Sequence, residues 1–98
     1  MAYRWMTERA YAVRLSGAAR KQLSRLDRSA QIRVLKAVSL LERHPRPPAA
    51  KRLSGESKWW RLRIGDYRVI YSIDDGRLVV AVVRIAHRSS AYRNDDFG

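Results

Sequence analysis

Residues 59–85 read WWRLRIGDYRVIYSIDDGRLVVAVVRI, and this stretch decides the fold. Residues 60–64 alternate apolar residues with arginines at the period of two that a β-strand requires, and two further apolar runs follow. The pattern predicts three strands, over residues 59–64, 68–73 and 78–85. Gly65-Asp66 and Asp75-Gly76 separate them, and both dipeptides are typical of tight turns between antiparallel strands. We therefore expect an antiparallel meander of three strands.

The residues before the meander predict one further strand and two helices. Residues 11–15 alternate like a short strand, which we expect at an edge of the sheet. Ser16 and Asp27 are favourable N-cap residues, and each precedes a helical pattern. The second helix should run to about Arg43, because the prolines of residues 45–48 cannot continue it. The apolar positions expected to face the core are Ala18, Ala19, Leu23 and Leu26 in the first helix and Val34, Leu35, Val38 and Leu41 in the second.

This order of elements predicts an α+β protein with two layers. The N-terminal strand and the helical hairpin should pack on a mostly antiparallel sheet that ends in the three-stranded C-terminal meander. A length of 98 residues suits one domain. We assign residues 10–93 to that domain, residues 1–9 to a flexible tail and residues 94–98 to a second tail. One face of the sheet should remain partly open.

The charge of the chain points to an anionic partner. Lysine and arginine number 21 against 9 acidic residues, which gives a formal net charge of +12. Nucleic acid is the usual partner of a domain this basic. Most of the cations are arginines, which bind phosphate through two parallel hydrogen bonds and stack on bases, and this suits RNA. The other explanation of the high ratio of arginine to lysine is the coding composition of the genome.

Several classes of function are disfavoured by composition. The chain has no cysteine, which excludes disulfides, thiol catalysis and zinc bound by cysteine. No carboxylate cluster or histidine spacing fits a metal site, so we expect neither a metal nor another cofactor. No apolar run is long enough to cross a membrane. We expect a cytoplasmic protein that does not bind membranes.

Alternation along the first meander strand predicts a basic site. Its apolar residues must pack on the helices, so Arg61 and Arg63 should project from the open face. Arg68 begins the next strand, and three more polar residues follow the last strand. Converging near one end of the sheet, these groups could bind a phosphodiester and stabilise the charge that develops in phosphoryl transfer. The candidate site residues are Arg61, Arg63, Arg68, His87, Arg88 and Tyr92; the other interpretation is a set of solvated arginines on a polar sheet face.

The sequence resembles a known family over roughly residues 10–93. The resemblance rests on KRLSG at 51–55, WRLRIGDYRVIY at 60–71, RIAHR at 84–88 and Tyr92-Arg93. These segments are similar to the RelE/ParE superfamily of bacterial type II toxins, and most similar to its RelE branch. The resemblance implies a cognate antitoxin, and contact with operator DNA only through the toxin–antitoxin complex. RelE-type toxins enter the ribosomal A site and cut messenger RNA there, with the ribose 2′-hydroxyl as nucleophile and without a metal.

The resemblance also implies roles for residues. The basic catalytic positions of the family fall on Arg61, Arg63, Arg68 and Arg88, and its C-terminal aromatic falls on Tyr92. RelE proper tends to carry lysines at the first two positions, and arginine cannot give up its proton as lysine can. Arg63 should therefore fix and neutralise the phosphate, which leaves His87 and Tyr92 as candidates for proton transfer. Residues expected to bind RNA are Lys51, Arg52, Lys58, Trp59, Tyr67 and Arg93.

Three functions remain open from the sequence. The first is a ribosome-dependent messenger RNA endonuclease. The second is a ParE-like inhibitor of DNA gyrase, because the ParE branch shares the fold but lacks the basic catalytic set. The third is an inactive member that binds antitoxin and operator DNA. The basic residues favour the first.

Overall fold

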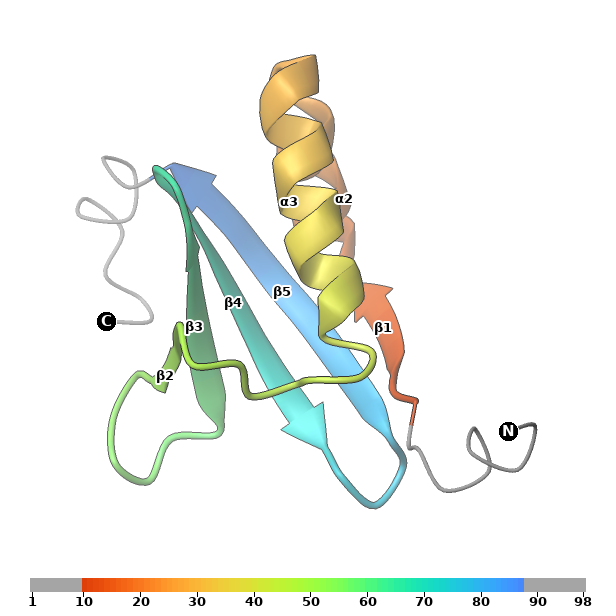
Figure 1. Ribbon diagram of the computed structural model, residues 1–98, viewed down its shortest axis with the longest axis vertical. Coiled ribbons are helices and arrows are strands. Elements are labelled where there is room, and N and C mark those ends of the chain that lie inside the picture. The colour runs from red at the N-terminus through yellow and green to blue at the C-terminus, as the bar shows by residue number, and fades with distance from the viewer. Residues whose placement is uncertain (1–9, 88–98) are drawn as a thin grey trace.

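The computed structural model describes residues 10–87, which form two helices packed on one face of a five-stranded sheet (Figure 1). In chain order the elements are β1 (Ala12–Leu15), α2 (Gly17–Ser24), α3 (Arg28–Leu40), β2 (Ala50–Arg52), β3 (Trp59–Ile64), β4 (Tyr67–Asp74) and β5 (Val79–His87). The strand order is β1-β5-β4-β3-β2; β1 runs parallel to β5, and all other neighbours are antiparallel. The predicted α+β, two-layer fold with its C-terminal meander is confirmed. The expected tails at 1–9 and 94–98 lie outside the described residues.

The core lies between the helices and the sheet. Helix α2 packs mainly on β5 and also contacts β1, while α3 contacts β3. Both helices begin directly after the N-cap residues that were predicted from the sequence. Ser16 Oγ accepts a hydrogen bond from the Ala19 amide at 3.0 Å, and Asp27 Oδ1 accepts one from the Ala30 amide at 2.8 Å. The buried side chains of this core include Val34 and Val38 of α3, Leu41 directly after it, and Leu62, Val69, Tyr71, Val80, Val82 and Ile85 of the sheet.

The helix predictions were wrong in three details. Leu35 is 47% exposed, because the stripe that reaches the sheet is narrow and uses Val34, Val38 and Leu41. Ala18 is also exposed. Helix α3 ends at Leu40, before the predicted Arg43.

Two features of the sheet were not predicted. The short strand β2 pairs with β3, although it directly follows the proline-rich segment. The turn between β4 and β5 spans residues 75–78, where a tight Asp75-Gly76 turn was expected. The residue with positive φ in this turn is Leu78, at 57°, and the Arg77 amide donates a hydrogen bond to Asp74 Oδ1 at 3.0 Å.

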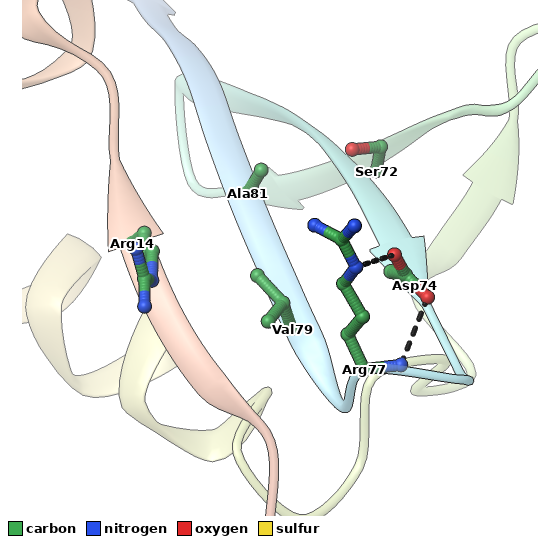
Figure 2. Close-up of a pocket in the computed structure, with 6 residues that line it drawn as sticks. All are labelled: Arg14, Ser72, Asp74, Arg77, Val79 and Ala81. Atoms are coloured by element: carbon green, nitrogen blue, oxygen red, sulfur yellow. Dashed lines mark hydrogen bonds and ion pairs between the residues drawn. The ribbon is translucent and has the colours of Figure 1, made fainter.

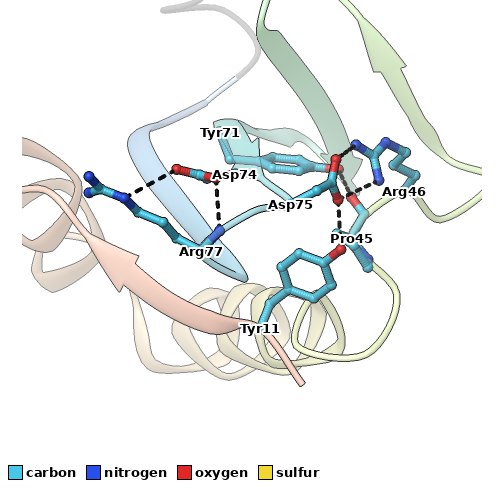
Figure 3. A network of polar contacts seen from close by, with 7 residues as sticks. All are labelled: Tyr11, Pro45, Arg46, Tyr71, Asp74, Asp75 and Arg77. Carbon is cyan, nitrogen blue, oxygen red and sulfur yellow. Dashed lines mark hydrogen bonds and ion pairs between the residues drawn. The ribbon is translucent and has the colours of Figure 1, made fainter. Parts of the chain in front are cut away.

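A polar network fixes the end of the sheet at which β4 meets β5 (Figure 3). The Tyr11 hydroxyl donates to Asp75 Oδ1 at 2.6 Å, and Arg46 Nη2 pairs with Asp75 Oδ2 at 2.8 Å. The Tyr71 hydroxyl donates to the Pro45 carbonyl at 2.7 Å. The network joins the start of β1, the loop after α3 and the β4–β5 turn.

Both tyrosines of this network hold their protons more tightly than free tyrosine. Burial raises the pKa of Tyr71 to about 12. The hydrogen bond to Asp75, followed by desolvation, raises the pKa of Tyr11. The neutral phenols are therefore part of the folded structure at physiological pH.

Within residues 10–87, neither helix combines the length and the apolar character that a membrane-spanning helix needs.

Candidate nucleic-acid interface

The strand register places five cations of strands β2 to β5 on the sheet face opposite the helices. Residues that face each other on neighbouring strands project to the same side of a sheet. Arg63 stands opposite Arg68, and Lys51 stands opposite Arg61. Ile70 stands between Arg61 on β3 and Arg84 on β5. We call the set Lys51, Arg61, Arg63, Arg68 and Arg84 the basic face; the intervening residues Leu62, Val69 and Ile85 point into the core.

Arg63 and Arg68 form the cationic pair at one end of this face. Two like charges directly opposite each other on adjacent strands destabilise a sheet. Arg63 is exposed, and its side chain forms no hydrogen bond or ion pair with any residue between 10 and 87. Arg68 is half-buried, and its Nε atom is shielded from solvent. An anion bound between the two guanidinium groups would relieve their repulsion, and phosphate matches the geometry of arginine.

Arg84 is a member of the basic face that we did not select from the sequence. A β-bulge between Ile70 and Tyr71 explains its position: Tyr71 pairs with Val82, while Ile70 pairs with Arg84. Val83 is therefore the extra residue, and the bulge reverses the alternation of β5. Regular alternation from the buried Val82 would have put Arg84 into the core. The one signal in the sequence was an arginine within an otherwise apolar strand.

The same bulge sends His87 to the opposite side of the sheet. His87 pairs with Tyr67, and their rings meet edge to face with centroids 5.3 Å apart. Tyr67 packs against the core beneath the helices, in register with Ile64. The structure therefore does not bring His87 or Tyr67 onto the face that carries Arg63 and Arg68.

The other predicted RNA-binding residues divide between the two faces. Trp59 stands opposite Ser72 on the side of the basic face, and the Lys58 ammonium group lies 4.9 Å from the centroid of its ring. Arg52 pairs with Trp60 on the helix side, and its guanidinium carbon lies 5.3 Å from the Trp60 ring. Arg88, Tyr92 and Arg93 lie outside the described residues.

Comparisons with known proteins identify the family of this chain. Residues 13–92 match a family model described as the ParE toxin of the type II toxin-antitoxin system parDE. The chain belongs to this family, within the RelE/ParE superfamily of type II toxins. It is 33% identical over 87 residues to toxin RelG of Mycobacterium tuberculosis, a match that covers 85% of this chain and 97% of RelG. A 31-residue match to toxin RelE of the same organism is 58% identical and covers 32% of each chain.

A solved structure shows the same fold. The toxin–antitoxin complex RelBE2 of Mycobacterium tuberculosis contains a chain that aligns with this toxin at a TM-score of 0.74 and 31% identity. The alignment covers 83% of this toxin and 94% of that chain.

This type II toxin offers a candidate site built from arginines. Among its described residues, no group of three or more His, Asp or Glu side chains is placed to hold a metal ion. What the basic face can supply is positive charge gathered on one side of the sheet. Such charge binds a polyanion and stabilises a phosphate that gains negative charge.

Proposed function

We propose that this toxin is a ribosome-dependent endoribonuclease that cuts messenger RNA in the A site and so inhibits translation. The observation that carries the proposal is the direct opposition of Arg63 and Arg68 within the basic face. Arg61 and Arg84 lie on the same side of the sheet, one on each side of Ile70, two residues after Arg68 on β4. A phosphodiester bound there would be contacted by guanidinium groups from neighbouring strands.

The reaction that this arrangement suits is internal transesterification. The ribose 2′-hydroxyl loses its proton to water as its oxygen attacks phosphorus, the bond to the 5′-oxygen breaks and that oxygen takes up a proton, and a 2′,3′-cyclic phosphate and a 5′-hydroxyl are formed. The transition state carries extra negative charge on the phosphoryl oxygens, which fixed guanidinium groups stabilise. Arginine remains protonated throughout, so these residues act by charge and position. Ribosomal binding would align the 2′-oxygen for in-line attack.

Proton transfer to the leaving 5′-oxygen needs a different group. Of the two candidates from the sequence, His87 lies with Tyr67 on the far side of the sheet. We therefore assign this step to Tyr92, and keep Arg88 as a further cation at the site.

His87→Gln separates these roles. Because His87 projects away from the basic face, we expect the variant to cleave messenger within about threefold of the unmodified toxin, whereas loss of a general acid costs about 10²-fold or more. The measurement is the cleavage rate on translating ribosomes at several pH values, with Tyr92→Phe as the matched comparison. A loss of two orders of magnitude for His87→Gln, with unchanged thermal stability, would return His87 to the reaction.

The partners follow from the same proposal. The relative RelBE2 was solved as a toxin–antitoxin complex. We propose that a cognate antitoxin likewise binds and silences this toxin, and that operator DNA is contacted only through that complex. The substrate is messenger RNA on the ribosome, so the toxin would act in the cytoplasm without binding membranes.

Inhibition of DNA gyrase is the second candidate, since the matching family model is described as a ParE toxin. The two activities separate in purified systems. The endonuclease stops protein synthesis in a cell-free translation reaction and leaves gyrase supercoiling unchanged. A gyrase inhibitor gives the reverse result in both assays, and that result would overturn our proposal.

A further inference from the structure

A hollow of about 490 Å³ lies on the sheet at the end away from Arg63 and Arg68 (Figure 2). Two arginines stand at its sides, one from β1 and one from the turn before β5. Its lining residues are Arg14, Ser72, Asp74, Arg77, Val79 and Ala81. None of these residues belongs to the site described above.

The hollow opens on the same side of the sheet as the basic face. One register row runs across four strands, from Arg14 through Ala81 and Ser72 to Trp59. Trp59 lies two residues before Arg61 on β3, so both project to one side. The two central residues of this row, Ala81 and Ser72, are small and line the hollow, and Trp59 stands next to Ser72 in the register.

The charges of the hollow favour an anion over a cation. Arg14 is exposed, and its guanidinium forms no hydrogen bond or ion pair with residues 10–87. Arg77 is 85% exposed at its side chain, and its Nε lies 3.9 Å from Asp74 Oδ2. A contact of that length between exposed groups contributes little, so Arg77 can turn to another anion at small cost. Asp74 leaves one net positive charge among the three residues.

The spacing between the hollow and the Arg63–Arg68 pair suits a single strand of RNA. Arg68 and Ser72 lie four residues apart on β4, which corresponds to about 13 Å along the strand. Arg61 and Arg84 lie between them on the same side. A segment of a few nucleotides would therefore meet cations along its whole length, and an aromatic ring beside the hollow for stacking.

We propose that this hollow is a second RNA subsite, which binds the backbone of the same strand a few nucleotides from the scissile phosphate. Arg14 and Arg77 contact the phosphate there, and Trp59 stacks on the adjoining base. The inference rests on the proposed function, because it takes RNA as the ligand of the basic face. It adds to that function the course of the RNA across the sheet, from the Arg63–Arg68 pair to the hollow.

The test measures binding of two lengths of RNA to the full-length toxin. The probes are 2′-O-methyl oligouridines of about two and about ten nucleotides; the shorter has one internal phosphate and cannot reach both sites, and neither can be cut because the nucleophile is blocked. Arg14→Ala with Arg77→Ala should weaken the longer probe about tenfold at low salt and leave the shorter one unchanged. The dependence of log Kd on log salt for the longer probe should fall by about 0.7, the value for one phosphate of a single strand that is no longer neutralised. Asp74→Asn keeps the oxygen that the Arg77 amide needs and should tighten the longer probe.

Matched controls separate this inference from the proposed function. Arg20→Ala with Arg28→Ala removes the same charge from the helix layer, where both side chains are exposed. Arg63→Ala with Arg68→Ala should weaken both probes. If that pair weakens both while the Arg14 and Arg77 pair behaves like the helix control, the second subsite is wrong and the proposed function stands. If neither double substitution weakens RNA binding, the second subsite and the proposed function are both wrong. If the Arg14 and Arg77 substitutions weaken only the binding of the antitoxin, the hollow is a protein contact and the inference is overturned.

Discussion

Replacing Arg63 and Arg68 with alanine should abolish messenger cleavage and leave the toxin folded. The two residues stand opposite each other on β3 and β4, so their guanidinium groups would contact the same phosphate. Removing one preorganised group that stabilises transition-state charge costs about 10²- to 10³-fold in rate, so the double variant should lose at least about 10³-fold. The loss should appear in kcat on translating ribosomes, because the charge that these groups stabilise is largest in the transition state.

Folding should survive the double substitution for two reasons. Arg63 is exposed, and its removal also ends the repulsion between two cations in register. Arg20→Ala with Arg28→Ala is the control of equal charge, because these side chains lie on the helices and away from the basic face. Equal rates for the two double variants would show that net charge, and not the Arg63–Arg68 pair, supports the activity. Thermal unfolding of both proteins checks that each is folded.

Alkali should unfold this toxin as Tyr71 loses its proton. Tyr71 is fully buried, and burial raises its pKa from 10.0 to about 12. The folded state therefore binds the proton more tightly than the unfolded chain. The stabilisation that results is complete below pH 10 and is lost as the pH rises through about 12. Two pKa units correspond to about 2.7 kcal/mol, a large share of the stability of a small domain. Tyr11 shifts in the same direction and adds to the effect.

Tyr71→Phe isolates this contribution. The variant keeps the ring in the core and loses the hydrogen bond to the Pro45 carbonyl, which should cost about 1 kcal/mol at neutral pH. Urea unfolding at a series of pH values gives the free energy of unfolding of each protein. The unmodified toxin should lose stability more steeply than the variant between pH 10 and pH 12, while the titration of lysines is common to both. Parallel curves would mean that deprotonation of Tyr71 does not cause the loss of stability at high pH.

The sequence predicted an element correctly where the local pattern of apolar and polar residues matches the pattern of buried and exposed positions in the structure. The strand over residues 59–64 was predicted with its observed bounds, because Trp60, Leu62 and Ile64 alternate with arginines. Ser16 and Asp27 were recognised as caps, because each has a side-chain oxygen that can accept a hydrogen bond from a free amide of the first helical turn. Strand β2 was not recognised, because three residues pair with β3 through long-range contacts that leave no local pattern.

The candidate site was predicted in part for a similar reason. Arg61, Arg63 and Arg68 belong to strands with regular alternation, so their shared face follows from the sequence. Arg84 and His87 lie beyond the bulge in β5, and the run VVAVV before them is apolar at every position. In a run that is apolar throughout, the sequence does not show at which residue a bulge reverses the sides to which the side chains point. The face of each residue after it is set by pairing with β4.

The most direct test of the central claim is the map of cut sites on a messenger, with the chemistry of the new ends. The toxin is added to messenger on translating ribosomes and, separately, to the same messenger without ribosomes. If the basic face carries out transesterification, cuts appear in the A site of the translated sample only, each leaving a 2′,3′-cyclic phosphate and a 5′-hydroxyl, and they vanish with Arg63→Ala and Arg68→Ala. Intact messenger on ribosomes, together with arrest of gyrase by the same preparation, would contradict the account.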